Sequence, residues 1–180
     1  AEEAFLRGAD ITLIRGANAV EPQYDFKDIK INSVKELFNE IKKNIGNNDI
    51  MIHAAAVSDF TINNKAKNKI KSNKNMHLEL TPTTKIFENI KKIKKNILLV
   101  GFKAEYKVSE KELVNRAHEL LKNADADLVI ANDVGKKGAG FDVETNEVFI
   151  VNKNKNAKHL KLADKRVIGN EILNEIRNLN

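Results

Sequence analysis

Short apolar runs alternate with longer amphipathic stretches along almost the whole chain, and this alternation limits the possible folds more than any other feature. Short apolar runs bounded by turn residues are typical of buried strands. The expected strands are residues 11–16, 29–31, 49–57, 76–80, 96–105, 126–133 and 147–152. Strands that alternate with helices form β-α-β units, so the sequence predicts a mostly parallel sheet covered by helices on both faces.

The stretches between these runs carry helix start and stop signals. Ser33 with Glu36, and Ser109 with Glu112, have the capping-box spacing of a helix N-terminus, and Gly46 is a stop signal. The expected helices are residues 1–6, 33–46, 85–95, 109–123 and 162–179. Either Thr83 or Thr84 is placed to cap the helix over residues 85–95. The apolar face expected for the last helix consists of Val167, Ile168, Ile172, Leu173, Ile176 and Leu179.

Turn signals at Gly140 and at residues 144–146 predict that the later strands add an antiparallel hairpin. A chain of 180 residues is long enough for one domain with its own core and short for two, so we expect a single domain over residues 1–180. The predicted architecture is a Rossmann-like, three-layer α/β fold. It combines a mostly parallel sheet, helices on both faces and an antiparallel hairpin extension.

Composition excludes several classes of protein. The hydrophobic fraction of 42% and the charged fraction of 31% are those of a globular chain rather than a disordered one. The longest apolar runs, such as residues 97–100 and 128–131, are too short to span a bilayer. No signal-peptide pattern opens the sequence, so a cytoplasmic location is expected. The chain contains no cysteine, which excludes disulfides, thiolate metal sites and a cysteine nucleophile.

Small and polar residues follow three of the predicted strands, at residues 54–60, 101–105 and 131–135. Ligands of open parallel sheets bind at the carboxyl ends of the strands, and small residues such as Ala55 and Ala56 let the backbone approach a ligand closely. The acids and the amide that can bind hydroxyl groups or hold a cation there are Asp59, Glu105, Asn132 and Asp133. The sequence therefore predicts a site for a phosphorylated ligand at this edge of the sheet.

Asp59 has two interpretations from its local sequence. An aspartate at the end of a strand often caps the following turn. Alternatively, its carboxylate contacts a ribose hydroxyl or a metal-bound phosphate. The neighbouring residues leave both interpretations open.

Residues 63–75, with the sequence NNKAKNKIKSNKN, form a basic stretch between two predicted strands. The stretch is a solvated loop, a nucleic-acid-binding arm or a flap over a charged ligand, in which Ile70 between Lys69 and Lys71 would be the anchor. The net charge of +6 decides little, because lysine is abundant throughout the chain. A nucleic-acid module is disfavoured because aromatic residues make up only 6% of the chain and none lies among these lysines to stack on bases.

Several familiar site motifs are absent from the sequence. Residues 135–140, GKKGAG, lack the Lys-Ser/Thr pair that completes a phosphate-binding P-loop, and no nucleophile-elbow motif occurs. The four histidines have no metal-ligand spacing, so we expect structural or surface roles for His53, His77, His118 and His159. A nicotinamide-dependent oxidoreductase stays open on the residues alone, because its glycine fingerprint would precede residue 1.

Five segments together resemble one family. They are AAAVSDF (54–60), KIKS (69–72), LELTPTTKI (78–86), LLVGFKAE (98–105) and LVIANDVGKKGAGFDVETNEVFIV (128–151). In this order they resemble phosphopantothenoylcysteine synthetase, the synthetase half of the bifunctional coenzyme A biosynthesis protein of bacteria and archaea. The resemblance covers essentially the whole chain, and its last segment is the most specific.

The resemblance implies a ligase. Such enzymes activate the carboxylate of 4′-phosphopantothenate with a nucleoside triphosphate, usually CTP, in the presence of Mg²⁺. The acyl-cytidylate then reacts with the amine of L-cysteine to give the amide and CMP. The resemblance also implies a homodimer and, in the full protein, a fused decarboxylase domain that binds FMN. It leaves the metal ligands unassigned.

The resemblance also implies roles for individual residues. Asp59 matches a nucleotide-contacting aspartate, and Lys69 matches the first lysine of a flap that is needed to form the acyl-nucleotide. Phe102 matches an aromatic residue beside the nucleotide, and Asn132 matches a strand-end asparagine at the site. Relatives often have Asn-Pro-Asp-Ile at the nucleotide, where this chain has Thr83, Thr84, Lys85 and Ile86. Only the isoleucine is retained, so these contacts are expected to come mostly from backbone.

The sequence departs from the family pattern in two respects. Bacterial relatives carry two lysines that reach the triphosphate where this chain has Leu120 and Ala124, and Lys122 lies on a different helical face. A nucleoside triphosphate other than CTP therefore stays possible. The family also has a strand and a Gly/Ser-rich loop ahead of the segment that opens this chain. We expect the chain to lack these parts, together with the decarboxylase domain and its FMN.

Overall fold

The computed structural model describes residues 1–62, 68, 75, 77–140 and 143–179. Its helices are α1 (Glu2–Leu6), α2 (Val34–Asn44), α3 (Ile86–Ile93), α4 (Glu110–Ala124) and α5 (Lys165–Arg177), with a 3-10 turn at Ile45–Asn47. Its strands are β1 (Thr12–Gly16), β2 (Lys27–Ile31), β3 (Ile50–His53), β4 (Phe60–Ile62), β5 (Leu80–Pro82), β6 (Leu98–Glu105), β7 (Leu128–Asp133), β8 (Thr145–Asn152) and β9 (Ala157–Asp164). None of these helices is long and apolar enough to cross a membrane.

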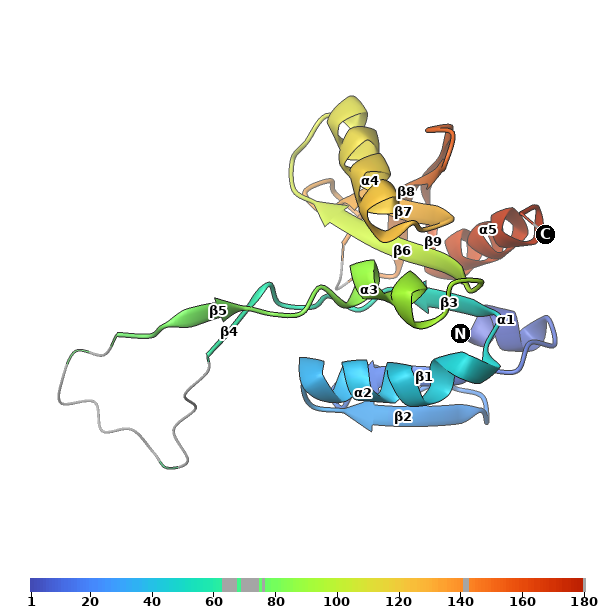
Figure 1. Cartoon of the computed structure of the whole chain (residues 1–180). Helices are drawn as coiled ribbons and strands as arrows, with labels where there is room; N and C mark the ends of the chain where they lie inside the picture. The colour runs from blue at the N-terminus through green and yellow to red at the C-terminus, as the bar shows by residue number, and fades with distance from the viewer. Residues whose placement is uncertain (63–67, 69–74, 76, 141–142, 180) are drawn as a thin grey trace.

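A five-stranded sheet in the order β3-β6-β7-β8-β9 forms the centre of the molecule (Figure 1). Strands β3, β6 and β7 are parallel, whereas β8 and β9 each run antiparallel to the preceding strand in the sheet. Strands β1 and β2 form a separate parallel pair beside α2. The predicted α/β architecture and its antiparallel extension are confirmed.

Apolar cores on the two faces of the sheet hold the layers together. On one face, α2, α3 and α4 contribute the buried side chains Leu37, Ile41, Ile90, Leu113 and Leu121. On the other face, α5 contributes Ile168, Ile172 and Ile176. Strand β7 lies between the two cores and is buried at every position. Burial on both faces explains why this strand is a continuous apolar run rather than an alternating one.

The predicted capping boxes of α2 and α4 are confirmed. Ser33 and Ser109 each accept a hydrogen bond at 3.2 Å from a backbone N–H, that of Glu36 and that of Glu112 respectively. The predicted threonine cap of α3 is wrong. The N-cap of α3 is Lys85, which forms no side-chain cap. Thr83 does not serve as the cap, because its hydroxyl donates to the carbonyl oxygen of Ser58.

Strand β9 is missing from the sequence prediction. Only Leu160 and Ala163 of this strand are partly buried and the other residues are exposed, so its apolar signal is weak. The hairpin between β8 and β9 turns at residues 153–156, where Lys155 has a positive φ of 63°. The turn signals at Gly140 and Glu144 lie in the longer connection between β7 and β8, which pair antiparallel as predicted, whereas Thr145 and Asn146 already belong to β8.

Helix α5 begins later than predicted, because β9 continues to Asp164. The carboxylate of Asp164 caps the helix by accepting a hydrogen bond from the backbone N–H of Arg166 at 2.7 Å. The apolar face is also narrower than predicted. Val167 and Leu179 are 54% and 46% exposed, so they do not belong to the buried face.

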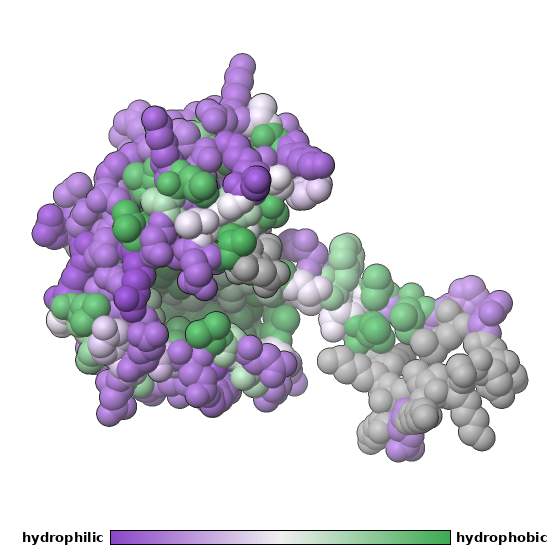
Figure 2. Space-filling model, turned by 180° about the vertical axis from the view of Figure 1, so that it is seen from behind, coloured by the Kyte–Doolittle hydropathy of each residue, from purple (hydrophilic) through white to green (hydrophobic). Residues whose placement is uncertain are grey.

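Strands β4 and β5 form an arm that projects from the body of the molecule (Figures 1 and 2). The strand predicted over residues 76–80 lies later in the chain, as β5. The arm exposes three large apolar side chains, because Phe60, Leu78 and Leu80 are 54%, 55% and 57% exposed. A two-stranded ribbon alone buries little apolar area, so this surface stays in contact with water within one chain.

Candidate active site

A cavity of about 840 Å³ opens at the carboxyl ends of β3 and β6, beside the end of β7. Its wall combines the segment after β3, the N-terminus of α3 and side chains of β6 and β7. The sequence-predicted residues in this wall are Ala55, Ala56, Asp59, Thr83, Thr84, Lys85, Ile86, Phe102 and Asn132. Residues that lie far apart in the sequence therefore converge on one cavity. Lys69, Ile70 and Lys71 lie outside the described residues.

Asp59 and Lys85 form an ion pair across the mouth of this wall. Their side chains are 66% and 55% exposed. The hydrogen bond from Lys85 lowers the pKa of Asp59, and the same contact raises the pKa of Lys85. Asp59 therefore pairs with a lysine from another segment instead of capping the turn that follows it. The carboxylate is ionised and open to the cavity.

Backbone contacts hold the two segments of this ion pair together. The hydroxyl of Thr83 donates to the carbonyl oxygen of Ser58 at 2.5 Å, and the backbone N–H of Thr83 donates to the carbonyl oxygen of Asp59 at 2.9 Å. These bonds explain why Thr83 does not cap α3. They fix the start of α3 beside the end of the small-residue segment.

The first residues of α3 line the cavity. Ile86 is only 2% exposed and Phe87 only 9%, because both side chains belong to the core. Lys85 provides no side-chain cap for the first backbone N–H groups of the helix. Such groups carry partial positive charge and can bind an anion.

Phe102 and Asn132 enter the wall from neighbouring parallel strands. Their positions follow from the register between β6 and β7, in which Phe102 lies opposite Ile130 and Ala104 opposite Asn132. Phe102 also packs against the core under α5. Asn132 is 7% exposed and its amide nitrogen donates to the side-chain oxygen of Asn146 at 3.4 Å. An aromatic surface and a held amide thus lie in the same wall as Asp59.

Comparison with known proteins places the chain in a family. The sequence model of the family described as "DNA/pantothenate metabolism flavoprotein C-terminal domain" matches residues 1–179. The chain belongs to this family. The resemblance deduced from the sequence motifs is thereby confirmed.

Three similar proteins illustrate the family. The coenzyme A biosynthesis bifunctional protein CoaBC of Thermococcus kodakarensis is 39% identical over 181 residues, which are 99% of this chain and 43% of that protein. The structure of the DNA/pantothenate metabolism flavoprotein from Streptococcus pneumoniae aligns with a TM-score of 0.85 at 26% identity, covering 99% of this chain and 85% of the other. The C-terminal domain of a CoaBC protein aligns with a TM-score of 0.76 at 28% identity, covering 98% and 79%. The chain spans about two fifths of the length of the CoaBC relative, as the 43% coverage shows.

Two other strand-end acids of this family member are not available to a ligand, which corrects the sequence prediction. Glu105 pairs with Arg116 at 2.5 Å and with Lys103 at 3.1 Å. Asp133 is 6% exposed, and its Oδ1 accepts hydrogen bonds from the backbone N–H groups of Lys107 at 2.7 Å and Gly135 at 2.8 Å. Glu105 thus joins β6 to α4, and Asp133 holds the loops that follow β6 and β7, so both carboxylates are already engaged within the protein.

Two polar residues at strand ends, His53 and Lys103, line the cavity although the sequence analysis did not select them as site residues. His53, the last residue of β3, lines the cavity and stacks on Phe87, with ring centroids 5.9 Å apart and planes at 14°. Burial lowers the pKa of His53. Lys103 also lines the cavity, and its positive charge contributes to the lowered pKa of Asp59 after the larger effect of Lys85. Their positions at the ends of β3 and β6 were the available signal.

The lysine-to-leucine departure from bacterial relatives falls on the cavity wall. Leu120 of α4 lines the cavity, whereas Ala124 is buried in the core and Lys122 is exposed. The wall at this point is therefore apolar.

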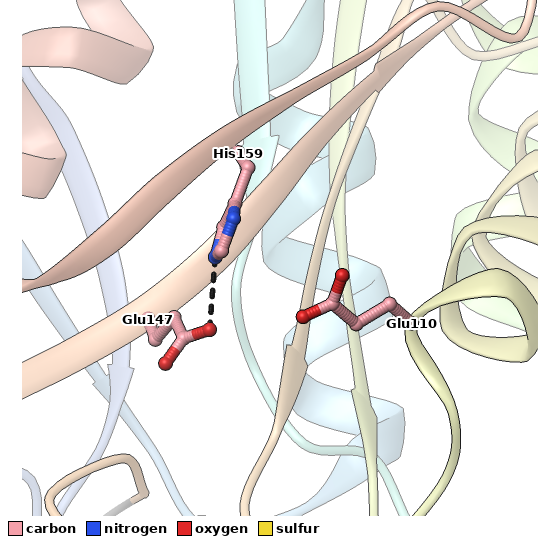
Figure 3. Close-up of side chains that lie close together, drawn as sticks. All are labelled: Glu110, Glu147 and His159. Carbon is pink, nitrogen blue, oxygen red and sulfur yellow. Dashed lines mark hydrogen bonds and ion pairs between the residues drawn. The ribbon is translucent and has the colours of Figure 1, made fainter.

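Glu110, Glu147 and His159 form a cluster of three metal-ligand types whose ligand atoms all lie within 4.8 Å of one another (Figure 3). His159 Nε2 lies 2.8 Å from Glu147 Oε1. Lys136 already supplies a positive charge here, since its Nζ lies 2.7 Å from Glu147 and 3.7 Å from Glu110. The hydrogen bond from Lys136 lowers the pKa of Glu147. The cluster is thus a closed ion-pair network, and the metal ligands stay unassigned.

A smaller cavity of about 340 Å³ lies at the opposite ends of the strands, around Asp127. The Asp127 carboxylate accepts hydrogen bonds from Lys91 at 2.9 Å and from the backbone N–H of Leu99 at 2.7 Å, and it pairs with Lys153 at 2.8 Å. These contacts tie α3, β6 and the β8–β9 turn to one carboxylate. The arrangement is structural, and it leaves the larger cavity as the candidate active site.

Proposed function

We propose that the chain is the ligase domain that joins 4′-phosphopantothenate to L-cysteine in coenzyme A biosynthesis. The observation that carries this proposal is the convergence of the family-matched residues Asp59, Ile86, Phe102 and Asn132 on one cavity. The CoaBC relatives support it, because they are named as coenzyme A biosynthesis bifunctional proteins. The alternatives of a nucleic-acid module and an oxidoreductase have no comparable support from the cavity.

The proposed reaction has two steps. A carboxylate oxygen of 4′-phosphopantothenate attacks the α-phosphorus of CTP, and the bond to pyrophosphate breaks. The amine of cysteine then attacks the acyl carbon, and the electrons of the C–O bond leave with CMP. A mixed anhydride divides one difficult acyl transfer into two easier steps.

The residues of the cavity suit the nucleotide side of this reaction. Phe102 offers an aromatic surface beside the base or ribose, and Asp59 offers an open carboxylate to a hydroxyl group or a cation. The uncapped start of α3 and the ammonium groups of Lys85 and Lys103 are placed to neutralise phosphate charge. Lys69, which matches the flap lysine of the family, is proposed to complete this charge during acyl-nucleotide formation.

Magnesium fits the donor set of the wall. Mg²⁺ prefers oxygen ligands and usually keeps several waters while it binds one or two carboxylates and substrate phosphates. Asp59 is the most open carboxylate of this kind in the described part of the wall, and Glu88 also lines it. When bound, the ion would neutralise charge on the triphosphate.

The wider assembly is also a proposal. We propose a homodimer, supported by the exposed apolar side chains of the β4–β5 arm, which a second copy would cover. In the complete protein we propose a fused decarboxylase domain, which would hold FMN, and a cytoplasmic location. The size of the purified complete protein in sedimentation tests the dimer directly.

The function is tested by the product and by the intermediate. Incubation of the complete protein with 4′-phosphopantothenate, cysteine, CTP and Mg²⁺ should yield the amide, CMP and pyrophosphate in equal amounts. Replacing CTP in turn by ATP, GTP and UTP identifies the nucleotide. The variant Lys69→Gln should fold normally but form acyl-nucleotide far more slowly. Absence of pyrophosphate release with every nucleotide would contradict the proposed function, and wild-type rates for Lys69→Gln would contradict the flap assignment.

A further inference from the structure

His53 is the only histidine in the described part of the cavity wall. It ends β3, and in the sheet register it lies opposite Gly101 of β6. The ring of Phe87 lies close above Gly101, since a Cβ atom built there would be 2.3 Å from Phe87 Cζ. Phe87 is therefore fixed between the sheet and the core. Its ring in turn holds the imidazole of His53 by stacking at 5.9 Å.

The imidazole nitrogens of His53 have no hydrogen-bond partner among the described residues, although several other polar groups of the wall do. Asp59 pairs with Lys85, Lys103 pairs with Glu105, and Asn132 bonds Asn146. A polar ring that is packed on one face and has unused nitrogen atoms at a cavity is suited to exchange a hydrogen with a bound ligand.

The protonation state of His53 follows from its surroundings. Burial disfavours the imidazolium, and it is the one cause that lowers the pKa of this ring. The charged side chains that share the cavity are Asp59, Lys85, Glu88, Lys103 and Lys165, and none of them contributes to the shift. At neutral pH the ring is therefore uncharged and presents one nitrogen lone pair.

We propose that His53 is the general base of the second step, where it takes a proton from the ammonium group of the incoming cysteine. This inference rests on the proposed ligase function. It assigns a catalytic role to a side chain that neither the motifs nor the family resemblance singled out. It also places the incoming amine on the β3 side of the cavity, next to the small-residue segment after His53.

The proposed step is balanced in protons and electrons. An ammonium nitrogen has no lone pair, so cysteine must lose one proton before it attacks. The lone pair of His53 accepts that proton, the amine nitrogen forms a bond to the acyl carbon, and the C–O bond to the nucleotide breaks with its electrons on CMP. The amide nitrogen loses its surplus proton to solvent, and the imidazolium later returns its proton to water.

The test compares two nucleophiles in the complete protein carrying His53→Phe, which keeps a ring on Phe87 but removes the base. Formation of acyl-nucleotide, measured by pyrophosphate release, should be preserved. Amide formation with cysteine should fall about 100-fold or more, which is the usual contribution of a general base. Trapping of the same intermediate by hydroxylamine should change little, because hydroxylamine is largely uncharged at neutral pH and needs no base to expose its lone pair.

The pH dependence gives a second measure that a structural role would not produce. The wild-type rate of amide formation should already be at its plateau at neutral pH. The rate of His53→Phe should instead keep rising in alkaline solution, as cysteine loses its proton to water, so that the deficit shrinks. His53→Gln should behave in the same way. His159→Phe is the matched control, because His159 also stacks on a phenylalanine, at 4.2 Å from Phe149, but lies outside the cavity.

The outcomes separate this inference from the proposed function. An equal loss with cysteine and hydroxylamine, or an unchanged rate with cysteine, would overturn the role of His53 while leaving the ligase intact. Absence of pyrophosphate release in the unmodified protein would contradict the proposed ligase function itself. Preserved hydroxylamine trapping with a pH-dependent cysteine defect supports the base.

Discussion

Asp59 and Asp133 lie at the same edge of the molecule, each just after or at the end of a strand, yet their carboxylates have opposite fates. The side chain of Asp59 is 66% exposed and pairs with one lysine. Asp133 is 6% exposed and accepts two backbone hydrogen bonds, from Lys107 and Gly135. The rule that ligands bind at strand ends selects both residues, but only one of them has a carboxylate free for a ligand.

The difference separates the site into a stabilised side and an open side. Around β7, polar side chains satisfy the backbone of sharp loops. Lys107, for instance, has a positive φ of 52°, and Asp133 holds its N–H in place. Around β3, the small-residue segment at 54–58 has few side chains that need a partner, and the carboxylate of Asp59 stays at the surface. A buried acceptor is costly to remove, whereas an exposed ion pair contributes little to stability.

The largest effect that tests this comparison is expected from Asp133→Ala. The substitution removes a buried carboxylate and leaves two part-buried backbone N–H groups without an acceptor, so the free energy of unfolding should fall by about 2–4 kcal/mol. Urea denaturation of the variant beside the wild type measures it. A loss no larger than that of Asp59→Ala would show that the two carboxylates are equivalent and that the comparison is wrong.

A smaller loss is expected from Gly135→Ala, which disturbs the same loop sterically. A Cβ atom at this position would lie 2.8 Å from Lys107 Cγ, 3.0 Å from Lys107 N and 3.1 Å from Asp133 Oδ1. Backbone cannot yield as a flexible side-chain end can, so we expect a loss of about 1–3 kcal/mol by thermal or urea unfolding. Gly46→Ala is the control, because nothing lies within 4 Å of a Cβ atom there. Gly→Ala without a clash lowers the entropy of the unfolded chain and should not destabilise, so a loss at Gly46 as large as that at Gly135 would contradict the steric explanation.

Much of the fold was predictable because its signals are local. The alternation of strands and helices, and the capping boxes at Ser33 and Ser109, depend on residues close together in the sequence. Strand β9 was not predictable in this way, since its pairing with β8 outweighs a weak apolar pattern. The threonine cap of α3 failed because Thr83 bonds the distant Ser58.

The sequence predicted several of the residues that line the candidate site, but it did not predict which of their side chains are free to bind a ligand. Family motifs and strand ends both pointed to Asp59 and Phe102, which do line one cavity. Whether an acid is free depends on partners brought by the tertiary fold, as the backbone amides near Asp133 show. His53 was overlooked because its setting is created by Phe87, which no spacing in the sequence links to it.

The stability of the protein in acid provides a milder test. Glu147 of β8 belongs to the stabilised side, because its carboxylate pairs with Lys136 in the loop after β7. The pKa of Glu147 is lowered below its ordinary 4.5, mainly by the hydrogen bond from Lys136. The associated stability is therefore present above pH 4.5 and is lost as the pH falls through the lowered pKa. Since Lys136 is 38% exposed, solvent screening limits the effect to about 1 kcal/mol or less.

Urea denaturation between neutral and strongly acidic pH measures this contribution. Glu147→Gln should be less stable than the wild type at neutral pH, and the difference should vanish in acid. Asp59→Asn should show almost no such convergence, although a lysine lowers the pKa of Asp59 as well. A larger acid-dependent loss at Asp59 than at Glu147 would reverse the assignment of the stabilised and open sides.

The smallest effect on stability, and the most informative for function, is expected from Asp59→Asn. An exposed ion pair contributes about 0–1 kcal/mol, so the free energy of unfolding should change by about 0.5 kcal/mol or less. A ligand that binds only the native state raises the unfolding midpoint by mass action, so CTP with Mg²⁺ should stabilise the wild type and stabilise this variant much less. Glu119→Gln removes the same charge from an exposed position outside the cavity and should keep the full ligand response. If Asp59→Asn retained that response while losing stability, Asp59 would belong with Asp133 among the structural carboxylates, and the open side of the site would have to be sought elsewhere in the cavity wall.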